Sequence, residues 1–183
     1  MEQRTIARAR EGDHEAFQAL VDLHGRQMWR TAWVLLGDRI LAEDAVQDAW
    51  LDVWQHLAQF DPTRELRPWL LTIVANRCRM NARRHVLPTV PMEKAALAAP
   101  HALADVAEQF AQREADSELH RACAALPTDQ RRIIELRFFA ELNVPEIAAI
   151  LQIPQGTVKS RLHRALAALR LRLPSATPGR PTP

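Results

Sequence analysis

The sequence of 183 residues lacks the features of a β-rich, secreted or membrane-spanning protein. It has no tyrosine and only five glycines, and no long stretch alternates apolar with polar residues, so few segments predict strands. No apolar run approaches the ~20 residues that cross a bilayer. The N-terminus lacks the basic and apolar regions of a signal peptide, and we therefore expect a cytoplasmic protein without membrane insertion.

Cysteine is also scarce, since only Cys78 and Cys123 are present. They are far apart and have no paired spacing, so neither a zinc site nor a disulfide framework is expected. We interpret both as small helix residues, with a redox-sensitive thiol as the alternative. No motif in the sequence predicts a cofactor.

Charge is distributed unevenly along the chain, although the net charge is only +2. Residues 1–85 are neutral, residues 86–120 carry a net charge of −4, and residues 121–183 carry +6. Of the 24 basic residues, only Lys94 and Lys159 are lysines. A basic C-terminal segment that follows an acidic connector is typical of a nucleic-acid-binding end.

Apolar residues recur at helical spacing through most of the chain. The segment 42–57 shows this best, because six of its apolar residues fall on one helix face: Val46, Ala49, Trp50, Val53, Trp54 and Leu57. Pro88, Pro91 and Pro100 mark a connector, and four prolines mark the C-terminal tail. We predict an all-α protein with two small helical domains at 1–85 and 113–173, a flexible linker at 86–112 and a disordered tail at 174–183.

A helix-turn-helix is predicted near the C-terminus. Asn143 and Glu146 have the spacing of a capping box, and Pro145 fits the first turn of the helix that follows. The segment 153–156 is expected to break this helix before a second one begins.

The second helix of this unit has one apolar and one basic, hydroxyl-rich face. Such a helix fits the major groove, where arginine can hold a guanine edge by two hydrogen bonds. The alternative is a solvated basic helix on an ordinary bundle. We assign DNA contact to Gln155, Thr157, Lys159, Ser160, Arg161 and Arg164.

Two groups of motifs carry a family resemblance. Leu126-Pro127, Glu146-Ile147-Ala148 and the segment 156–165 resemble region four of extracytoplasmic-function sigma factors, which reads the minus-thirty-five promoter element. The segment 42–50 resembles the region-two helix that docks on the clamp helices of the largest RNA polymerase subunit. Phe60-Asp61-Pro62, Arg67-Pro68-Trp69-Leu70 and the segment 73–77 resemble the part that melts and reads the minus-ten element.

The resemblance implies a role for each group of residues. Asp44, Gln47 and Asp48 would contact the polymerase, with a plain solvated face and a metal-dependent nuclease as alternatives. For Trp69, core packing is favoured over stacking on a base, and Trp29, Trp33, Trp50 and Trp54 are assigned to packing between helices. Contact with minus-ten DNA is assigned to Asn76, Arg79, Arg83 and Arg84.

The function implied is that of a sigma factor, which binds core RNA polymerase and directs it to promoter DNA without catalysing a reaction itself. Control by an anti-sigma factor is expected, and a compact, inactive arrangement of the two domains is a further hypothesis. The main alternative is a repressor or activator that uses the helix-turn-helix alone, as a dimer and without polymerase.

Overall fold

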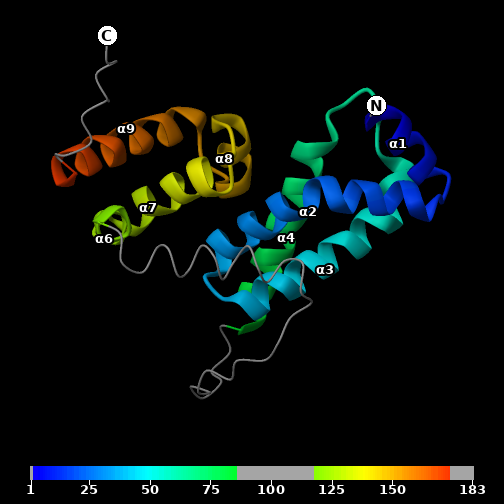
Figure 1. The fold of residues 1–183 in the computed structure, drawn as a ribbon, viewed down its shortest axis with the longest axis horizontal. Helices are drawn as coiled ribbons and strands as arrows, with labels where there is room; N and C mark the ends of the chain where they lie inside the picture. Colours follow the sequence, from blue (N-terminus) through cyan, green and yellow to red (C-terminus); the bar gives the residue numbers. More distant parts are fainter. Residues whose placement is uncertain (1, 86–117, 174–183) are drawn as a thin grey trace, which may run out of the picture.

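The computed structural model describes residues 2–85 and 118–173. The predicted linker, the first residues of the predicted second domain and the predicted tail lie outside these ranges. Within them the chain forms helices and turns with no strand, so the predicted all-α class is confirmed (Figure 1).

The first half contains four α-helices and one short 3-10 helix. The second and third helices are capped by residues directly before them. Asp13 accepts a hydrogen bond from the Ala16 N–H, and Asp38 accepts one from the Leu41 N–H. Gly37 ends the second helix at φ 67°, where a residue without a side chain is favoured. The elements are α1 (Glu2–Arg10), α2 (His14–Leu36), α3 (Arg39–His56), η1 (Leu57–Gln59) and α4 (Leu66–His85).

Residues 118–173 form four α-helices and one π-helical turn. The helix that begins at Thr128 is α-helical to Ile134 and continues as a π-helical turn to Phe139. These elements are α6 (Glu118–Ala124), α7 (Thr128–Ile134), η2 (Glu135–Phe139), α8 (Val144–Leu151) and α9 (Gln155–Arg172).

The described part has three apolar clusters. The first fills the space between α1, α2, α3 and α4, where Trp29 is buried and Trp33 and Trp50 pack against the cluster. Trp54 stacks on His14, with ring centroids 4.8 Å apart. These four tryptophans therefore pack between helices, as predicted.

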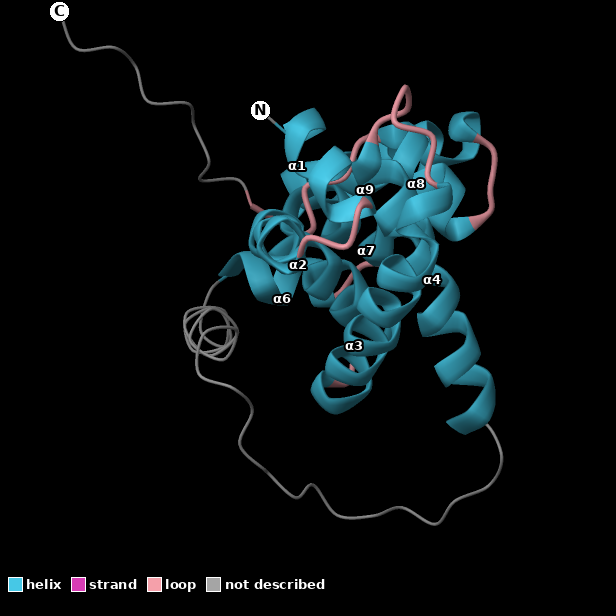
Figure 2. Ribbon diagram, turned by 90° about the vertical axis from the view of Figure 1, so that its right-hand side faces the viewer, coloured by secondary structure: helices cyan, strands magenta, loops and turns pink. Residues whose placement is uncertain are grey.

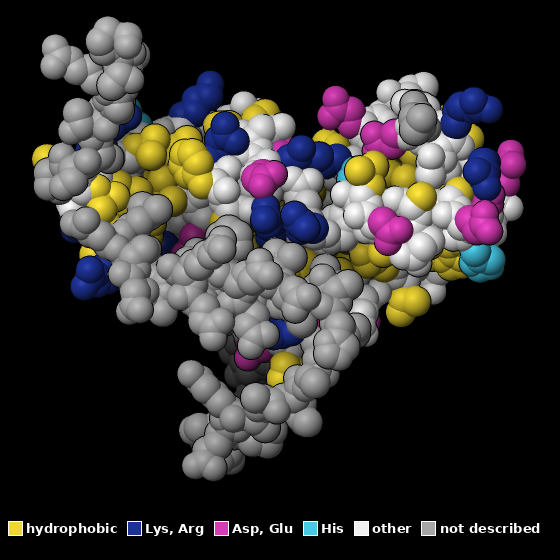
Figure 3. Space-filling view, in the orientation of Figure 1, with side chains coloured by type: hydrophobic (Ala, Val, Ile, Leu, Met, Phe, Trp, Pro, Cys, Tyr) yellow, Lys and Arg dark blue, Asp and Glu magenta, His cyan; other side chains and the backbone are white. Residues whose placement is uncertain are grey.

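The other two clusters shape the second half. One joins α6, α7 and α9, and Figure 3 shows hydrophobic side chains gathered at that end of the molecule. The other lies between the halves, because Leu71 and Ala75 of α4 share a cluster with residues such as Ile147 of α8. Helix α8 packs against α4, and η2 packs against α2 (Figures 1 and 2), so the two halves form one packed body.

Candidate polymerase and nucleic-acid interfaces

The outer face of α3 carries the residues predicted to bind polymerase. Asp44 and Gln47 are exposed and Asp48 is half-buried. The opposite face is apolar and fully buried, as at Ala45 and Ala49. Within the described ranges Asp44 and Gln47 make no hydrogen bond or ion pair, so these two side chains are available to a partner.

An ion pair ties this helix to α4. The Arg77 guanidinium donates two hydrogen bonds to the Asp52 carboxylate and lies 3.9 Å from Asp48. The hydrogen bonds from Arg77 hold the pKa of Asp52 below its ordinary value, and Asp52 raises the pKa of Arg77 in turn. Arg77 therefore points from α4 toward α3.

The residues predicted to contact minus-ten DNA differ in their surroundings. Asn76 and Arg83 are exposed on α4. Arg79 is half-buried; it donates to the Asn76 side-chain oxygen and, at 2.9 Å, to the Ile150 carbonyl of α8. The side chain of Arg84 lies outside the described part of the chain.

A pocket of about 420 Å³ opens beside Asn76. Phe60 and Trp69 form one part of its wall, with ring centroids 4.9 Å apart. Sequence reasoning missed His56 and Gln59, which follow Asp52 by about one and two helical turns. The pocket is lined by Asp52, His56, Gln59, Phe60, Trp69, Ile73 and Asn76.

The first helix of the helix-turn-helix, α8, begins with the capping box that the sequence predicts. Asn143 Oδ1 accepts from the Glu146 N–H at 2.9 Å, and Glu146 Oε2 accepts from the Asn143 N–H at 2.7 Å, which confirms the capping box. The turn is shorter than predicted. Pro154 is the N-cap of α9, so Gln155 and Gly156 already belong to the helix and not to the turn.

The outer face of α9 is open to solvent. Gln155, Lys159, Ser160 and Arg164 are exposed, while Val158 and other residues of the opposite face are buried. Ser160 and Arg164 donate only to carbonyls of their own helix, at 3.1 and 3.4 Å. Duplex DNA could therefore reach this face without moving another element.

Two other predicted DNA residues on α9 are half-buried, Thr157 and Arg161. The Arg161 guanidinium lies 3.2 Å from the Asp129 carboxylate of α7. Arg161 therefore leans toward α7 and away from the most exposed stripe of the helix.

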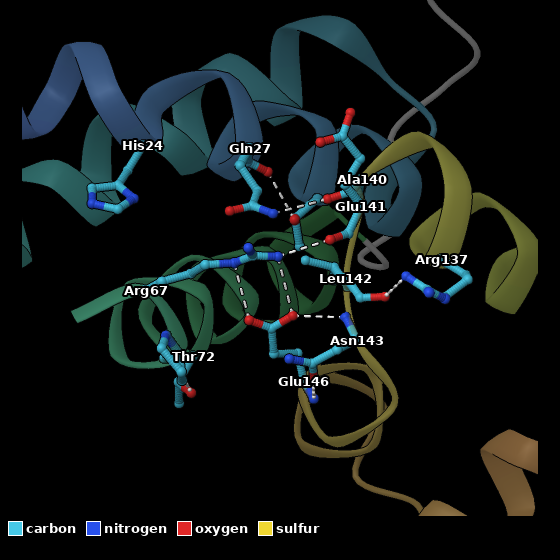
Figure 4. A network of polar contacts seen from close by, with 12 residues as sticks. His24, Gln27, Arg67, Thr72, Arg137, Ala140, Glu141, Leu142, Asn143 and Glu146 are labelled. Carbon is cyan, nitrogen blue, oxygen red and sulfur yellow. Dashed lines mark hydrogen bonds and ion pairs between the residues drawn. The ribbon is translucent and has the colours of Figure 1, made fainter. Parts of the chain in front are cut away.

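Polar contacts hold the two halves together around Arg67 (Figure 4). Its Nε lies 3.0 Å from Glu146, whose side chain is 5% exposed, and its Nη2 donates at 2.7 Å to the Glu141 carbonyl. Glu146 thus serves the capping box and the ion pair at once. The sequence gave no sign of this pairing because 79 residues separate the partners.

Helix α2 adds to the same contact. Arg30 pairs with the Glu141 carboxylate at 2.7 Å, and Gln27 donates to the Ala140 carbonyl at 3.1 Å. Glu141 has a φ of 57°, a strained value for a residue with a side chain. Figure 3 shows Lys and Arg side chains gathered where the halves meet.

Within residues 2–85 and 118–173, no helix has the length and apolar character to cross a membrane. In the same ranges no three His, Cys, Asp or Glu side chains come together as a metal site requires. Neither Cys78 nor Cys123 forms a disulfide; Cys78 is buried, which raises its pKa to about 12.

Comparisons with known proteins identify the family. Models of sigma-70 region 2 and region 4 match residues 20–86 and 116–169. The chain is 34% identical over 178 residues to the ECF RNA polymerase sigma factor SigL of Mycobacterium tuberculosis, which covers 92% of this chain and 94% of the relative.

Two solved structures are similar. CnrH, solved with the cytosolic domain of CnrY, has a TM-score of 0.62 at 26% identity and covers 96% of this chain and 99% of that one. RpoE of Bartonella quintana, solved with the anti-sigma factor NepR, has a TM-score of 0.58 at 23% identity, covers 88% and 98%, and shows the fold alone. The chain belongs to the extracytoplasmic-function (ECF) RNA polymerase sigma factors.

Proposed function

We propose that this chain binds core RNA polymerase in the cytoplasm through the outer face of α3 and places α4 on the minus-ten and α9 on the minus-thirty-five promoter element. The observation that carries the proposal is the presence, in one sigma-family chain, of two exposed faces of opposite charge. Asp44 and Asp48 suit a basic partner, and Lys159 and Arg164 suit DNA phosphates and base edges. The chain contributes binding energy and no catalytic step.

The pocket beside Asn76 supports a role in strand opening. A base that leaves the duplex needs an aromatic surface to stack on and polar groups to meet its edge. Phe60 and Trp69 supply rings, while Gln59 and Asn76 supply amides. We therefore extend the minus-ten contact from the predicted residues to this pocket, where Trp69 both packs on the core and faces the opening.

Control by an anti-sigma factor is the second part of the proposal. Arg79, a predicted DNA contact, is held by the Ile150 carbonyl while the halves are packed together. A regulator that stabilised the packed arrangement would keep this arginine from DNA. RpoE, which is similar to this chain in fold, was solved in complex with the anti-sigma factor NepR. That complex supports an anti-sigma factor as a partner of this chain.

Run-off transcription with core polymerase tests the proposal. The purified chain should direct initiation from a subset of genomic fragments, and core enzyme alone should not. Asp48→Lys should reduce both core affinity and transcription, since it places a like charge against a basic partner. Tight promoter binding by the chain alone, with no gain from core enzyme, would instead favour a repressor or activator.

A further inference from the structure

Two large apolar side chains remain exposed on the outer face of α3. Ile40 is 54% exposed and Leu51 is 61% exposed. Neither belongs to any of the three apolar clusters of the described residues. Single exposed apolar residues need no explanation, but these two share their helix face with the polar residues assigned to polymerase.

Their positions form one narrow stripe. Residues 40, 44, 47 and 51 follow each other at intervals of four, three and four, so their side chains project from the same side of the helix. Ile40 and Leu51 are three turns apart, about 16 Å along the axis. Asp44 and Gln47 lie between them, and the order along the stripe is apolar, acidic, amide, apolar.

Charge selects the kind of partner. Within α3 and its neighbours, Glu43 is paired with Arg39 and Asp52 with Arg77. Asp48 lies 3.9 Å from the same Arg77, so Asp44 is the acidic group of α3 that has no ion pair among the described residues. DNA would be repelled by it, and a second copy of the face would bring like charges together.

We infer that Ile40 and Leu51 are apolar anchors of the polymerase interface, one on each side of an acidic centre at Asp44. The partner is a helix of the polymerase with basic residues at its middle and apolar residues three turns apart. This inference rests on the proposed function and assigns it two further residues. Burial of a leucine stabilises a complex by an amount that salt does not screen, whereas the contribution of Asp44 falls as salt rises.

The test compares two leucines of equal exposure. Leu51→Ser should raise the Kd for core polymerase roughly tenfold, since a fully buried leucine contributes at least that much. Leu51→Met, which keeps an apolar side chain of similar size, should restore most of the affinity. Leu23, also 61% exposed but on α2, provides the control, and Leu23→Ser should leave the Kd unchanged.

A salt series separates the anchor from the acidic centre. The loss caused by Leu51→Ser should stay constant from low to high salt, while the loss caused by Asp44→Asn should shrink. Unchanged affinity of Leu51→Ser, or an equal loss in Leu23→Ser, overturns the inference and leaves the proposed function standing. A wild-type chain that does not bind core polymerase overturns both.

Discussion

Helices α4 and α9 are the two that we place on DNA, and their basic side chains are occupied differently. On α4, Arg77 is bound to Asp52 and Arg79 to the Ile150 carbonyl. On α9, Lys159 and Arg164 are exposed and Arg164 donates only to its own helix. If the two helices bind DNA as proposed, the face of α9 needs no rearrangement, whereas Arg79 of α4 must first be released from Ile150.

The cause lies in the neighbours of each helix. Ile150 is in the last turn of α8, where carbonyls have no partner within the helix and attract cations. Packing of α8 on α4 presents one such carbonyl to Arg79. The face of α9 has no element packed over Lys159 or Arg164 among the described residues. Arg79 of α4 is thus held by a neighbouring helix, whereas Arg164 of α9 is not.

The largest effect should come from Glu146, which links the two halves. Glu146→Ala removes the capping box and leaves Arg67 without its buried partner, and we expect a loss of about 2–3 kcal/mol in the free energy of unfolding. Urea unfolding measures the loss. Glu146→Ala should also release Arg79 from Ile150 more often, because the ion pair of Arg67 is one of the contacts that keep α8 on α4.

Glu141→Ala is the matched control. Glu141 pairs with Arg30 across the same contact, but its side chain is 70% exposed and it caps no helix. Its loss should stay below about 1 kcal/mol. Equal losses in the two variants would show that the buried position of Glu146 does not matter.

The next effect tests the difference between α4 and α9 directly. With core polymerase present, Arg164→Ala should weaken binding to a fully paired promoter fragment and to one already opened at the minus-ten element, by about 1–3 kcal/mol if it reads a base. Arg79→Ala should weaken binding only to the opened fragment, because Arg79 is occupied until α8 moves away. Fluorescence anisotropy with both fragments measures this.

Arg170 provides the control on the same helix. It is exposed on α9 but lies beyond the residues predicted to meet DNA, so Arg170→Ala should change little. The comparison fails if Arg79→Ala weakens binding to the paired fragment as much as Arg164→Ala does.

The Asp52–Arg77 pair should make stability depend on pH. Hydrogen bonds from Arg77 lower the pKa of Asp52 from its ordinary 3.8, so the pair stabilises the fold at neutral pH and loses its effect as pH falls through the lowered pKa. Asp52→Asn should cost about 1–2 kcal/mol near pH 7 and progressively less below pH 4.

Urea unfolding at several pH values measures that difference. Asp48→Asn is the control, since Asp48 lies 3.9 Å from Arg77 and accepts no hydrogen bond from it. Its cost near pH 7 should be smaller than that of Asp52→Asn. A cost for Asp52→Asn that persists at low pH would mean that the ionised pair is not what stabilises this site.

The sequence predicts what depends on near neighbours. The helical class follows from apolar spacing, and the capping box of Asn143 and Glu146 follows from two residues three apart. The packing of the tryptophans follows from their place on apolar stripes. Each of these is confirmed because local geometry alone decides it.

The sequence does not predict what depends on contacts between distant segments. Arg67 meets Glu146, and Arg79 meets Ile150, only after the halves have packed together. The same holds for the pocket, where Gln59 becomes a wall residue because Trp69 and Asn76 of α4 line the same space. An arginine on a DNA-facing stripe has the same sequence pattern whether it is free or held.

The smallest effect concerns Arg161, the one predicted DNA arginine of α9 that is held. Asp129 lies 3.2 Å from its guanidinium, and a carboxylate in that position can fix the plane in which arginine meets a base edge. If Arg161 reads a base, Asp129→Asn should reduce discrimination at one base pair by less than about 1 kcal/mol and leave other positions unchanged.

Competition binding with single-base variants of the minus-thirty-five element measures this, and Arg161→Ala should reduce discrimination at the same position by more. A gain in affinity for every sequence after Asp129→Asn would instead mean that Asp129 restrains Arg161 from DNA, as Ile150 restrains Arg79. In that case both helices hold one arginine back, and the difference between α4 and α9 lies only in how many of their basic groups a neighbour occupies.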